Sequence, residues 1–310
     1  MRILLHRADG NTGPWIEDFA RHLPEARVEV WSEEHSQGPY DYAVVWSPPQ
    51  AMLAQLAQVK AIFLTGAGVD ALMRYNDEIP AHIPVIRLED AGMAAQMAEY
   101  VSYAVLRYFR RLDEYEAQSR AGVWQPLAQH ERADFSVGVL GMGVLGSRVL
   151  EALKTFGFPL RGWSRGPKQM DGVECFHGMD GLDAFLRGSR VLVCMLPLTP
   201  ETSNLLDRSN MSKLPAGAYL INVARGAHVA EPDLLTLIKS GHISAATLDV
   251  FRNEPLPQQH PFWQEPRITI TPHISALTLR GESIAQMADK IRALGAGQSV
   301  AGVVDRSKGY

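Results

Sequence analysis

Short apolar runs alternate with amphipathic stretches from one end of the chain to the other. In the first hundred residues these runs predict strands at 2–6, 27–31, 42–46, 61–65 and 84–88. A second series of runs predicts strands at 136–140, 158–163, 190–198, 218–225, 243–251 and 267–273. Strands that alternate with helices are typical of βαβ units, so the pattern predicts an α/β protein with parallel sheets.

Helical segments border the second series of strands. Residues 93–110 place apolar groups at helical spacing, and a last helical pattern around 280–294 follows the final strand. The polar stretch 111–135 has weak periodicity and predicts a crossing between domains.

We therefore expect one domain to be interrupted in sequence by another. The first domain comprises residues 1–98 plus 277–310, and the second comprises 99–276. A length of 310 residues agrees with this division, because one hydrophobic core rarely fills so long a chain.

Composition narrows the class of protein. With 46% hydrophobic and 21% charged residues the chain resembles an average globular protein. A net charge of −4 gives no basic field for nucleic acid, and no apolar run reaches membrane-spanning length. The N-terminus is too soon polar for a signal peptide. Cys175 and Cys194 form neither a disulfide framework nor a metal-ligand pattern, so we expect no metal site and a reducing cytoplasm.

A glycine-rich turn predicts a dinucleotide site. In "VGVLGMGVLGSRVL" the glycines fall at 141, 143 and 146, after a strand and at the start of a helical pattern. Gly141 allows a tight turn, Gly143 lets the backbone approach a pyrophosphate, and Gly146 permits close packing of helix on strand. The helix N-terminus then presents unpaired amides to the anion.

The residues after the second strand of this unit predict which nucleotide binds. NAD-binding chains place a carboxylate here for the ribose hydroxyls. This chain has Ser164 and Arg165, with Lys168 close behind. A hydroxyl donor and a guanidinium suit a 2′-phosphate, so we expect NADPH, with NADH weaker. The alternative is a solvated basic turn.

Three further polar residues follow strands of the second series. They are Arg225 in "INVARG", Glu254 in "DVFRNEP" and His273 in "TPHIS". Ligands of open α/β folds bind at the carboxyl ends of strands, which makes this shared position informative. Structural alternatives are a carbonyl cap for Arg225, a surface carboxylate for Glu254 and a hydrogen-bonded structural histidine for His273.

Taken in order, these motifs resemble one family over nearly the whole chain. "GMGVLG", "LPLTPET", "INVARG", "LDVFRNEPLP" and "TPH" resemble the D-isomer-specific 2-hydroxyacid dehydrogenases. Within that family, "GAGVD", "RLED", "WQP", "WSR" and "VDRSKGY" are similar to the glyoxylate/hydroxypyruvate reductase A branch. The resemblance implies two doubly wound parallel-sheet domains, a flavodoxin-like substrate domain interrupted by a Rossmann domain.

The resemblance also implies roles for the three polar residues. His273 would donate a proton, Glu254 would be its partner, and Arg225 would bind and polarise the substrate. These roles suit the reduction of a 2-oxo acid, because hydride transfer to the carbonyl carbon develops an oxyanion that needs a proton and a positive charge.

Other positions complete the expected site. Gly66, Ala67 and Gly68 can turn backbone amides inward to hold the substrate carboxylate, or can form an ordinary glycine turn. Trp46 would wall the pocket. Asp249 would support the site from behind or accept a nicotinamide hydrogen bond. The expected cofactor contacts also include Val144, Leu145, Leu196, Pro197, Val223 and Ala224.

Several alternatives stay open at this stage. Many family members carry glycines just after the catalytic histidine, whereas Ser275 and Ala276 stand here, which leaves the nearby pocket shape undetermined. We expect an enzyme whose substrate is glyoxylate or hydroxypyruvate. The first alternative is the same enzyme acting on another small 2-oxo acid. The second alternative is a non-catalytic nucleotide-sensing dimer. The polar stretch near 112–133, with Trp124, suggests a homodimer contact as in relatives.

Overall fold

The computed structural model describes residues 1–36 and 38–309 and divides the chain into two compact units. Unit 1 comprises 1–92 and 278–310, and unit 2 comprises 93–277. One unit thus interrupts the other in sequence, with junctions at Gly92/Met93 and Leu277/Thr278. Tyr310, the last residue of the "VDRSKGY" motif, lies outside the described residues.

Unit 1 is built on a five-stranded parallel sheet with the order β2-β1-β3-β4-β5. Its strands are β1 Arg2–Arg7, β2 Arg27–Val30, β3 Tyr42–Trp46, β4 Ala61–Leu64 and β5 Val85–Ile86. This is the order of flavodoxin-like folds. The five strands overlap the five apolar runs of the first hundred residues. Strands β3 and β4 are almost continuously apolar because both of their faces are buried, whereas the edge strand β2 buries none of its residues.

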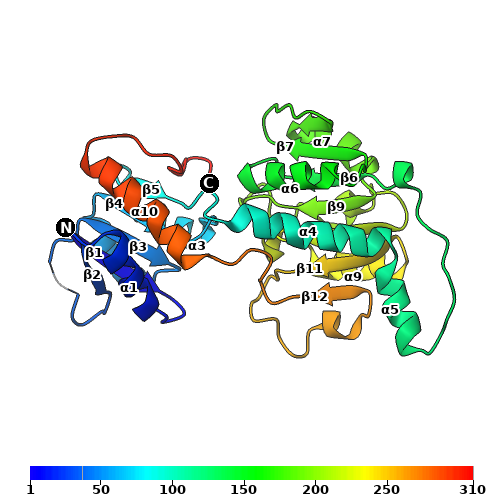
Figure 1. The fold of residues 1–310 in the computed structure, drawn as a ribbon, viewed down its shortest axis with the longest axis horizontal. Helices are drawn as coiled ribbons and strands as arrows, with labels where there is room; N and C mark the ends of the chain where they lie inside the picture. Colours follow the sequence, from blue (N-terminus) through cyan, green and yellow to red (C-terminus); the bar gives the residue numbers. More distant parts are fainter. Residues whose placement is uncertain (37, 310) are drawn as a thin grey trace. The chain divides into compact units, whose positions relative to one another are not determined.

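Short helices and one long C-terminal helix complete unit 1. They are α1 Gly13–His22, η1 Gln50–Met52, α2 Leu53–Leu56, α3 Asp70–Met73 and α10 Arg280–Gly295. Helix α10 packs against α1, and Arg280 of α10 forms an ion pair with the buried Asp18 of α1. The C-terminal helix therefore belongs to the same unit as the N-terminal strands (Figure 1).

Unit 2 is built on a seven-stranded parallel sheet with the order β12-β11-β10-β9-β6-β7-β8. Its strands are β6 Val137–Leu140, β7 Leu160–Ser164, β8 Val173–His177, β9 Val191–Cys194, β10 Ala218–Asn222, β11 Ile243–Leu248 and β12 Ile268–Ile270. The strand order reverses at β6, which pairs with β7 on one side and β9 on the other. Such a reversal is where nucleotides bind in doubly wound folds.

Helices cover both faces of this sheet. They are α4 Met93–Phe109, α5 Leu112–Arg120, α6 Val144–Lys154, α7 Gly178–Arg187, α8 Arg208–Met211 and α9 Glu231–Lys239, with short turns η2 Arg132–Asp134, η3 Gly226–His228 and η4 Pro261–Gln264. Strand β9 shows the consequence: Val191 and Val193 join the core under α4 and α6, whereas Leu192 and Cys194 join the core under α7 and α9. Figure 1 shows α4 and α6 across one face.

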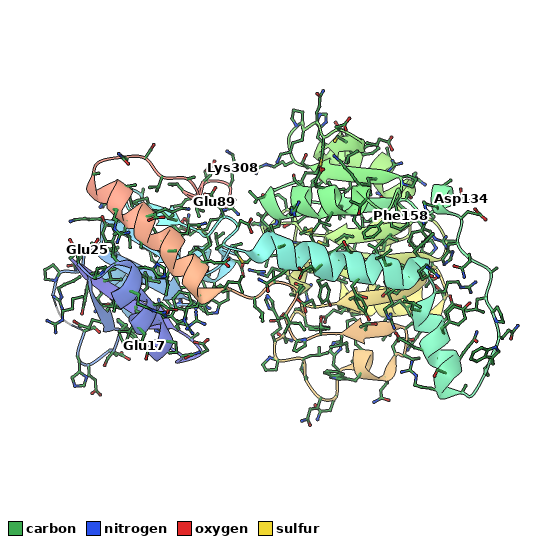
Figure 2. All side chains as sticks on the ribbon, in the orientation of Figure 1. Glu17, Glu25, Glu89, Asp134, Phe158 and Lys308 are labelled. Atoms are coloured by element: carbon green, nitrogen blue, oxygen red, sulfur yellow. The ribbon has the colours of Figure 1, made fainter. Side chains whose placement is uncertain are left out.

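The stretch 111–135 does not cross between domains, which corrects the sequence-based expectation. All of it lies in unit 2, where it forms α5 and an extended segment. Helix α5 buries none of its residues, so it has no apolar face to give the sequence a periodic signal. The segment returns to the unit through an aromatic cluster in which Phe158, labelled in Figure 2, packs against Phe109 and Phe135.

Among the residues that the structure describes, no helix combines the length and apolar character needed to span a membrane. The longest helix among the described residues, α4, covers the sheet of unit 2.

Candidate active site

The glycine motif forms the tight turn between β6 and α6. Gly141 has φ +106, and a Cβ there would lie 2.7 Å from the Met195 carbonyl oxygen. A Cβ on Gly146 would collide with the Gly141 carbonyl oxygen. Both positions therefore require glycine for reasons internal to the fold.

Gly143 differs from the other two glycines. A Cβ there would meet no atom of the described chain within 4 Å, and its backbone is extended. It directly precedes α6, whose first residues, the exposed Val144 and the half-buried Leu145, carry the amides of the first helical turn. The open space beside Gly143 suits a group outside the protein, such as a pyrophosphate.

The basic turn after β7 lies beside this glycine loop. Ser164 ends β7, and its buried hydroxyl donates to the Gly166 carbonyl at 2.8 Å. The Lys168 ammonium donates to the carbonyl of Met142, within the glycine loop. Ser164 thus shapes the turn in this structure, and its hydroxyl would have to rotate before it could donate to a phosphate.

Arg165 is exposed on the same turn, near the segment "LPLTPET". The hydrogen bond from Thr199, and to a smaller degree the charge of Arg165, hold the pKa of the Glu201 carboxyl below its usual value. The carboxyl ends of β6, β7 and β9 therefore bring the glycine loop, the basic turn and the 196–201 segment together. In this segment Leu196 is buried and Pro197 half-buried.

His273 and Glu254 form a hydrogen-bonded pair. The His273 Nδ1 lies 2.8 Å from the Glu254 Oε2, and both side chains are partly exposed, by 41% and 37%. Burial raises the pKa of Glu254, but hydrogen bonds from His273 and the Phe251 amide outweigh it and hold the pKa below its usual value. A carboxylate on Nδ1 leaves Nε2 as the nitrogen that can exchange a proton with a substrate.

A buried carboxylate holds the loop that carries His273. Asp249 is fully buried, and its two oxygens accept from the Thr271 hydroxyl and from the amides of Ile274 and Ser275. The His273 amide donates to the Asp249 carbonyl at 2.8 Å. Two roles were expected for Asp249, and this geometry favours support of the site from behind over a hydrogen bond to the nicotinamide.

The Asp249 network extends to α4. Because the Thr271 proton goes to Asp249, the hydroxyl of Tyr100 donates to the Thr271 oxygen, and burial raises the pKa of Tyr100 to about 12. Ser275 is buried and bonded through its amide.

Arg225 follows β10 in a turn that packs on the Glu254 loop. A Cβ on Gly226 would overlap the backbone of Phe251 and Arg252, so this glycine allows the two loops to touch. The Arg225 guanidinium donates to the Ala224 carbonyl at 2.8 Å, and its charge contributes to the lowered pKa of Glu254. Val223 and Ala224, just before it, are buried.

In loop 66–68 of unit 1, packing against a tryptophan explains the glycine at position 66. Gly66 is needed because a Cβ there would lie 2.8 Å from Cζ3 of the Trp46 ring. None of Gly66, Ala67 and Gly68 has a positive φ, so this turn does not depend on a left-handed residue. Among the described residues, however, the amides of Ala67 and Gly68 donate to no acceptor of the chain.

One residue of this region escaped the sequence analysis. His228 is fully buried beside Arg225 and contacts the Pro197 carbonyl. Its only sequence signal is a histidine two residues after "INVARG". Tyr100 and Thr271 were also missed, since a helix and a strand end give no sign of their pairing.

The geometry can be compared with known proteins. The family model "D-isomer specific 2-hydroxyacid dehydrogenase, NAD binding domain" matches residues 103–275. The chain belongs to this family. Two relatives described as glyoxylate/hydroxypyruvate reductase A, from Yersinia enterocolitica and Serratia proteamaculans, are 48% and 49% identical, and each alignment covers the whole of both chains.

Solved structures of this dehydrogenase family share the fold. A D-isomer specific 2-hydroxyacid dehydrogenase from Xanthobacter autotrophicus Py2, in complex with NADPH and MES, has 39% identity and a TM-score of 0.94 over 100% of this chain and 99% of that one. An NADPH-dependent glyoxylate/hydroxypyruvate reductase from Sinorhizobium meliloti, in complex with NADP and sulfate, has 31% identity and a TM-score of 0.92 with the same coverage. Two doubly wound parallel sheets, as expected from the sequence, are thus confirmed.

Proposed function

We propose that this dehydrogenase is an NADPH-dependent reductase of small 2-oxo acids that converts glyoxylate to glycolate and hydroxypyruvate to D-glycerate. The two full-length relatives named glyoxylate/hydroxypyruvate reductase A support the substrate class. The neighbours bound to NADPH and NADP support the cofactor.

The observation that carries the proposal is the pairing of His273 with Glu254 beside Arg225. A histidine with a carboxylate on Nδ1 presents Nε2 as a general acid, and a guanidinium close by can polarise a carbonyl. Neither a structural histidine nor a carbonyl cap would require all three groups at one place.

The reaction divides between the cofactor and these side chains. Bound NADPH would supply the hydride. Arg225 binds the 2-oxo acid and stabilises the oxyanion as it develops, and His273 donates its Nε2 proton to that oxygen. Glu254 keeps the imidazole oriented through its contact with Nδ1.

Loop 66–68 is proposed to hold the substrate carboxylate. The amides of Ala67 and Gly68 have no acceptor among the described residues, and a carboxylate would satisfy both. Trp46, packed on Gly66, would limit the size of the substrate.

The cofactor is proposed to lie along the ends of β6, β7 and β9. Gly141, Gly143 and Gly146, with the amides of Val144 and Leu145, would hold the pyrophosphate, and Arg165 and Lys168 would bind the 2′-phosphate. Leu196, Pro197, Val223 and Ala224 would line the remainder, and Asp249 would support it from behind. The missing phosphate would make NADH the weaker cofactor.

Two further properties belong to the proposal. The exposed extended segment after α5, with Val123 46% and Trp124 99% exposed, suits a contact between two copies of the chain. A cytoplasmic location would keep both cysteines, which are unpaired in the structure, reduced.

Steady-state loss of NADPH absorbance with a panel of 2-oxo acids tests the function. We expect turnover with glyoxylate and hydroxypyruvate, and a clear preference for NADPH over NADH measured in parallel. Turnover only with larger 2-oxo acids would correct the substrate. NADPH binding without turnover on any 2-oxo acid would favour a nucleotide sensor.

A further inference from the structure

His228 lies at the junction of the two loops assigned to substrate and cofactor. It ends η3, is fully buried, and follows Arg225 by three residues. Its ring is held at both ends: Nδ1 lies 3.2 Å from the Arg225 amide nitrogen and 3.0 Å from the Arg225 carbonyl oxygen, whereas Nε2 lies 3.2 Å from the Pro197 carbonyl oxygen.

Further hydrogen bonds surround His228 and Pro197. The Leu206 amide donates to the His228 carbonyl at 2.9 Å, and the Thr202 hydroxyl donates to the Pro197 carbonyl at 2.7 Å. Cys194, buried at the end of β9, also forms a hydrogen bond with the ring. The imidazole is therefore the side chain that joins the Arg225 turn to the 196–202 segment.

Each ring nitrogen of His228 can form the hydrogen bond that its backbone partner requires. The Pro197 carbonyl can only accept, so Nε2 must carry a proton and donate to it. Nδ1 can accept from the Arg225 amide, or, in the charged ring, donate to the Arg225 carbonyl. An apolar side chain of similar size would take the His228 acceptor from the buried Arg225 amide and would leave the Pro197 carbonyl with the Thr202 hydroxyl as its remaining donor, and losing such bonds is costly.

We propose that His228 is a positioning residue that couples the two loops, with its Nδ1 side fixing Arg225 for the 2-oxo acid and its Nε2 side fixing Pro197 for NADPH. This inference rests on the proposed function. It goes beyond it by assigning separate tasks to the two ring nitrogens of a residue that touches neither ligand.

Two conservative substitutions separate these tasks. The amide of asparagine reaches about as far as Nδ1, so His228→Asn keeps the Arg225 contact and loses the Pro197 contact. Glutamine reaches about as far as Nε2, so His228→Gln does the reverse, and His228→Leu loses both. Ile238→Val, a buried change on α9, is the control for lost packing in unit 2.

The readouts are the KM for glyoxylate and the Kd for NADPH, the latter from cofactor fluorescence without turnover. Loss of one neutral hydrogen bond is worth roughly 1 kcal/mol, or about fivefold. His228→Asn is expected to raise the Kd for NADPH about fivefold and to leave the KM for glyoxylate unchanged. His228→Gln is expected to raise the KM for glyoxylate about fivefold and to leave the Kd for NADPH unchanged. His228→Leu should raise both. The control should change neither.

If His228→Asn and His228→Gln give the same pattern as each other, or as the control, the inference is overturned. Absence of wild-type turnover on any 2-oxo acid would instead overturn the proposed function, and this role with it. Should the variants not fold, ¹⁵N-histidine spectra of the wild-type chain decide: NADP is expected to shift mainly Nε2 of His228 and oxamate mainly Nδ1. No shift of either nitrogen would overturn the coupling.

Discussion

His273 occupies the left-handed backbone region, with φ +56, which a non-glycine residue adopts only at a cost. Such conformations typically cost about 1–3 kcal/mol and persist where the surroundings hold them. Here the buried Asp249 holds the loop through its carbonyl and both carboxylate oxygens. The imidazole is thus placed by buried structure, although its tip is exposed.

The Glu254 carboxylate should contribute stability that depends on pH. Because its folded-state pKa lies below the usual 4.5, this contribution is fully present above about pH 4.5 and is lost as the pH falls through the lowered pKa. Glu254→Gln removes it. The difference in unfolding free energy between wild type and variant, from urea titrations, should therefore be present at pH 7 and shrink below pH 4.5.

The control for this titration is Glu99→Gln, which changes an exposed carboxylate on α4. It should show little difference at any pH. A Glu254→Gln difference that stays constant from pH 7 to pH 3 would contradict the assigned ionisation.

Arg165 should determine the choice of cofactor. Hydrogen bonds to charged groups contribute roughly 1.5–3 kcal/mol, so Arg165→Ala should raise the KM for NADPH about 10- to 100-fold. The KM for NADH, which lacks the 2′-phosphate, should hardly change. Arg187→Ala removes an exposed arginine at the end of α7 and serves as the control. An equal loss with both cofactors would contradict a phosphate contact.

At the scale of elements, two glycines of the turn between β6 and α6 should have different tasks: Gly146 allows helix and strand to pack, and Gly143 leaves room for the cofactor. Gly146→Ala would drive a Cβ into the Gly141 carbonyl and displace α6 from β6, so both stability and NADPH affinity should fall. Overpacking of this kind typically costs about 1–3 kcal/mol. The Cβ of Gly143→Ala would meet no atom of the described residues within 4 Å, so stability should be kept and only NADPH affinity lost.

Thermal unfolding and NADPH titration of the two variants distinguish these outcomes. A destabilised Gly143→Ala chain would show that this glycine serves the fold. Unaltered NADPH binding by it would remove the pyrophosphate from this loop.

Elements could be predicted from the sequence where burial leaves a pattern. Strands β3 and β4 of unit 1 and the central strands β6 and β9 of unit 2 are apolar because both of their faces are covered. Strand β8 at the sheet edge buries no residue fully, and it was missed. Helix α5 was missed for the same reason, since acidic residues in its first turn and the Arg111–Glu114 pair stabilise it in place of an apolar face.

The site could be predicted only in part, for a related reason. Glycines 141 and 146 are required by local backbone geometry, which sequence spacing reports. The collision of Gly66 with Trp46 and the contact of His228 with Pro197 depend on groups distant in sequence. Such pairings arise only when the sheets are assembled.

At the scale of the whole molecule, the exposed segment after α5 predicts assembly. Val123 and Trp124 present apolar surface that a second copy would cover, so the purified chain should sediment as a dimer. Trp124→Glu should shift the mass towards the monomer, whereas Trp263→Ala, at the half-exposed tryptophan of η4, should not. A wild-type chain that is monomeric at micromolar concentration would contradict the proposal.

The central claim is that His273 donates the proton during reduction of a 2-oxo acid, and one comparison tests it most directly. Turnover of glyoxylate with saturating NADPH is measured for the wild type and for His273→Gln, after NADPH titration and thermal unfolding have shown that the variant folds and binds cofactor. General acid catalysis is worth roughly 10²- to 10⁴-fold, so kcat should fall by about that factor with the Kd for NADPH unchanged. A folded, cofactor-binding His273→Gln chain with near wild-type kcat would contradict the account.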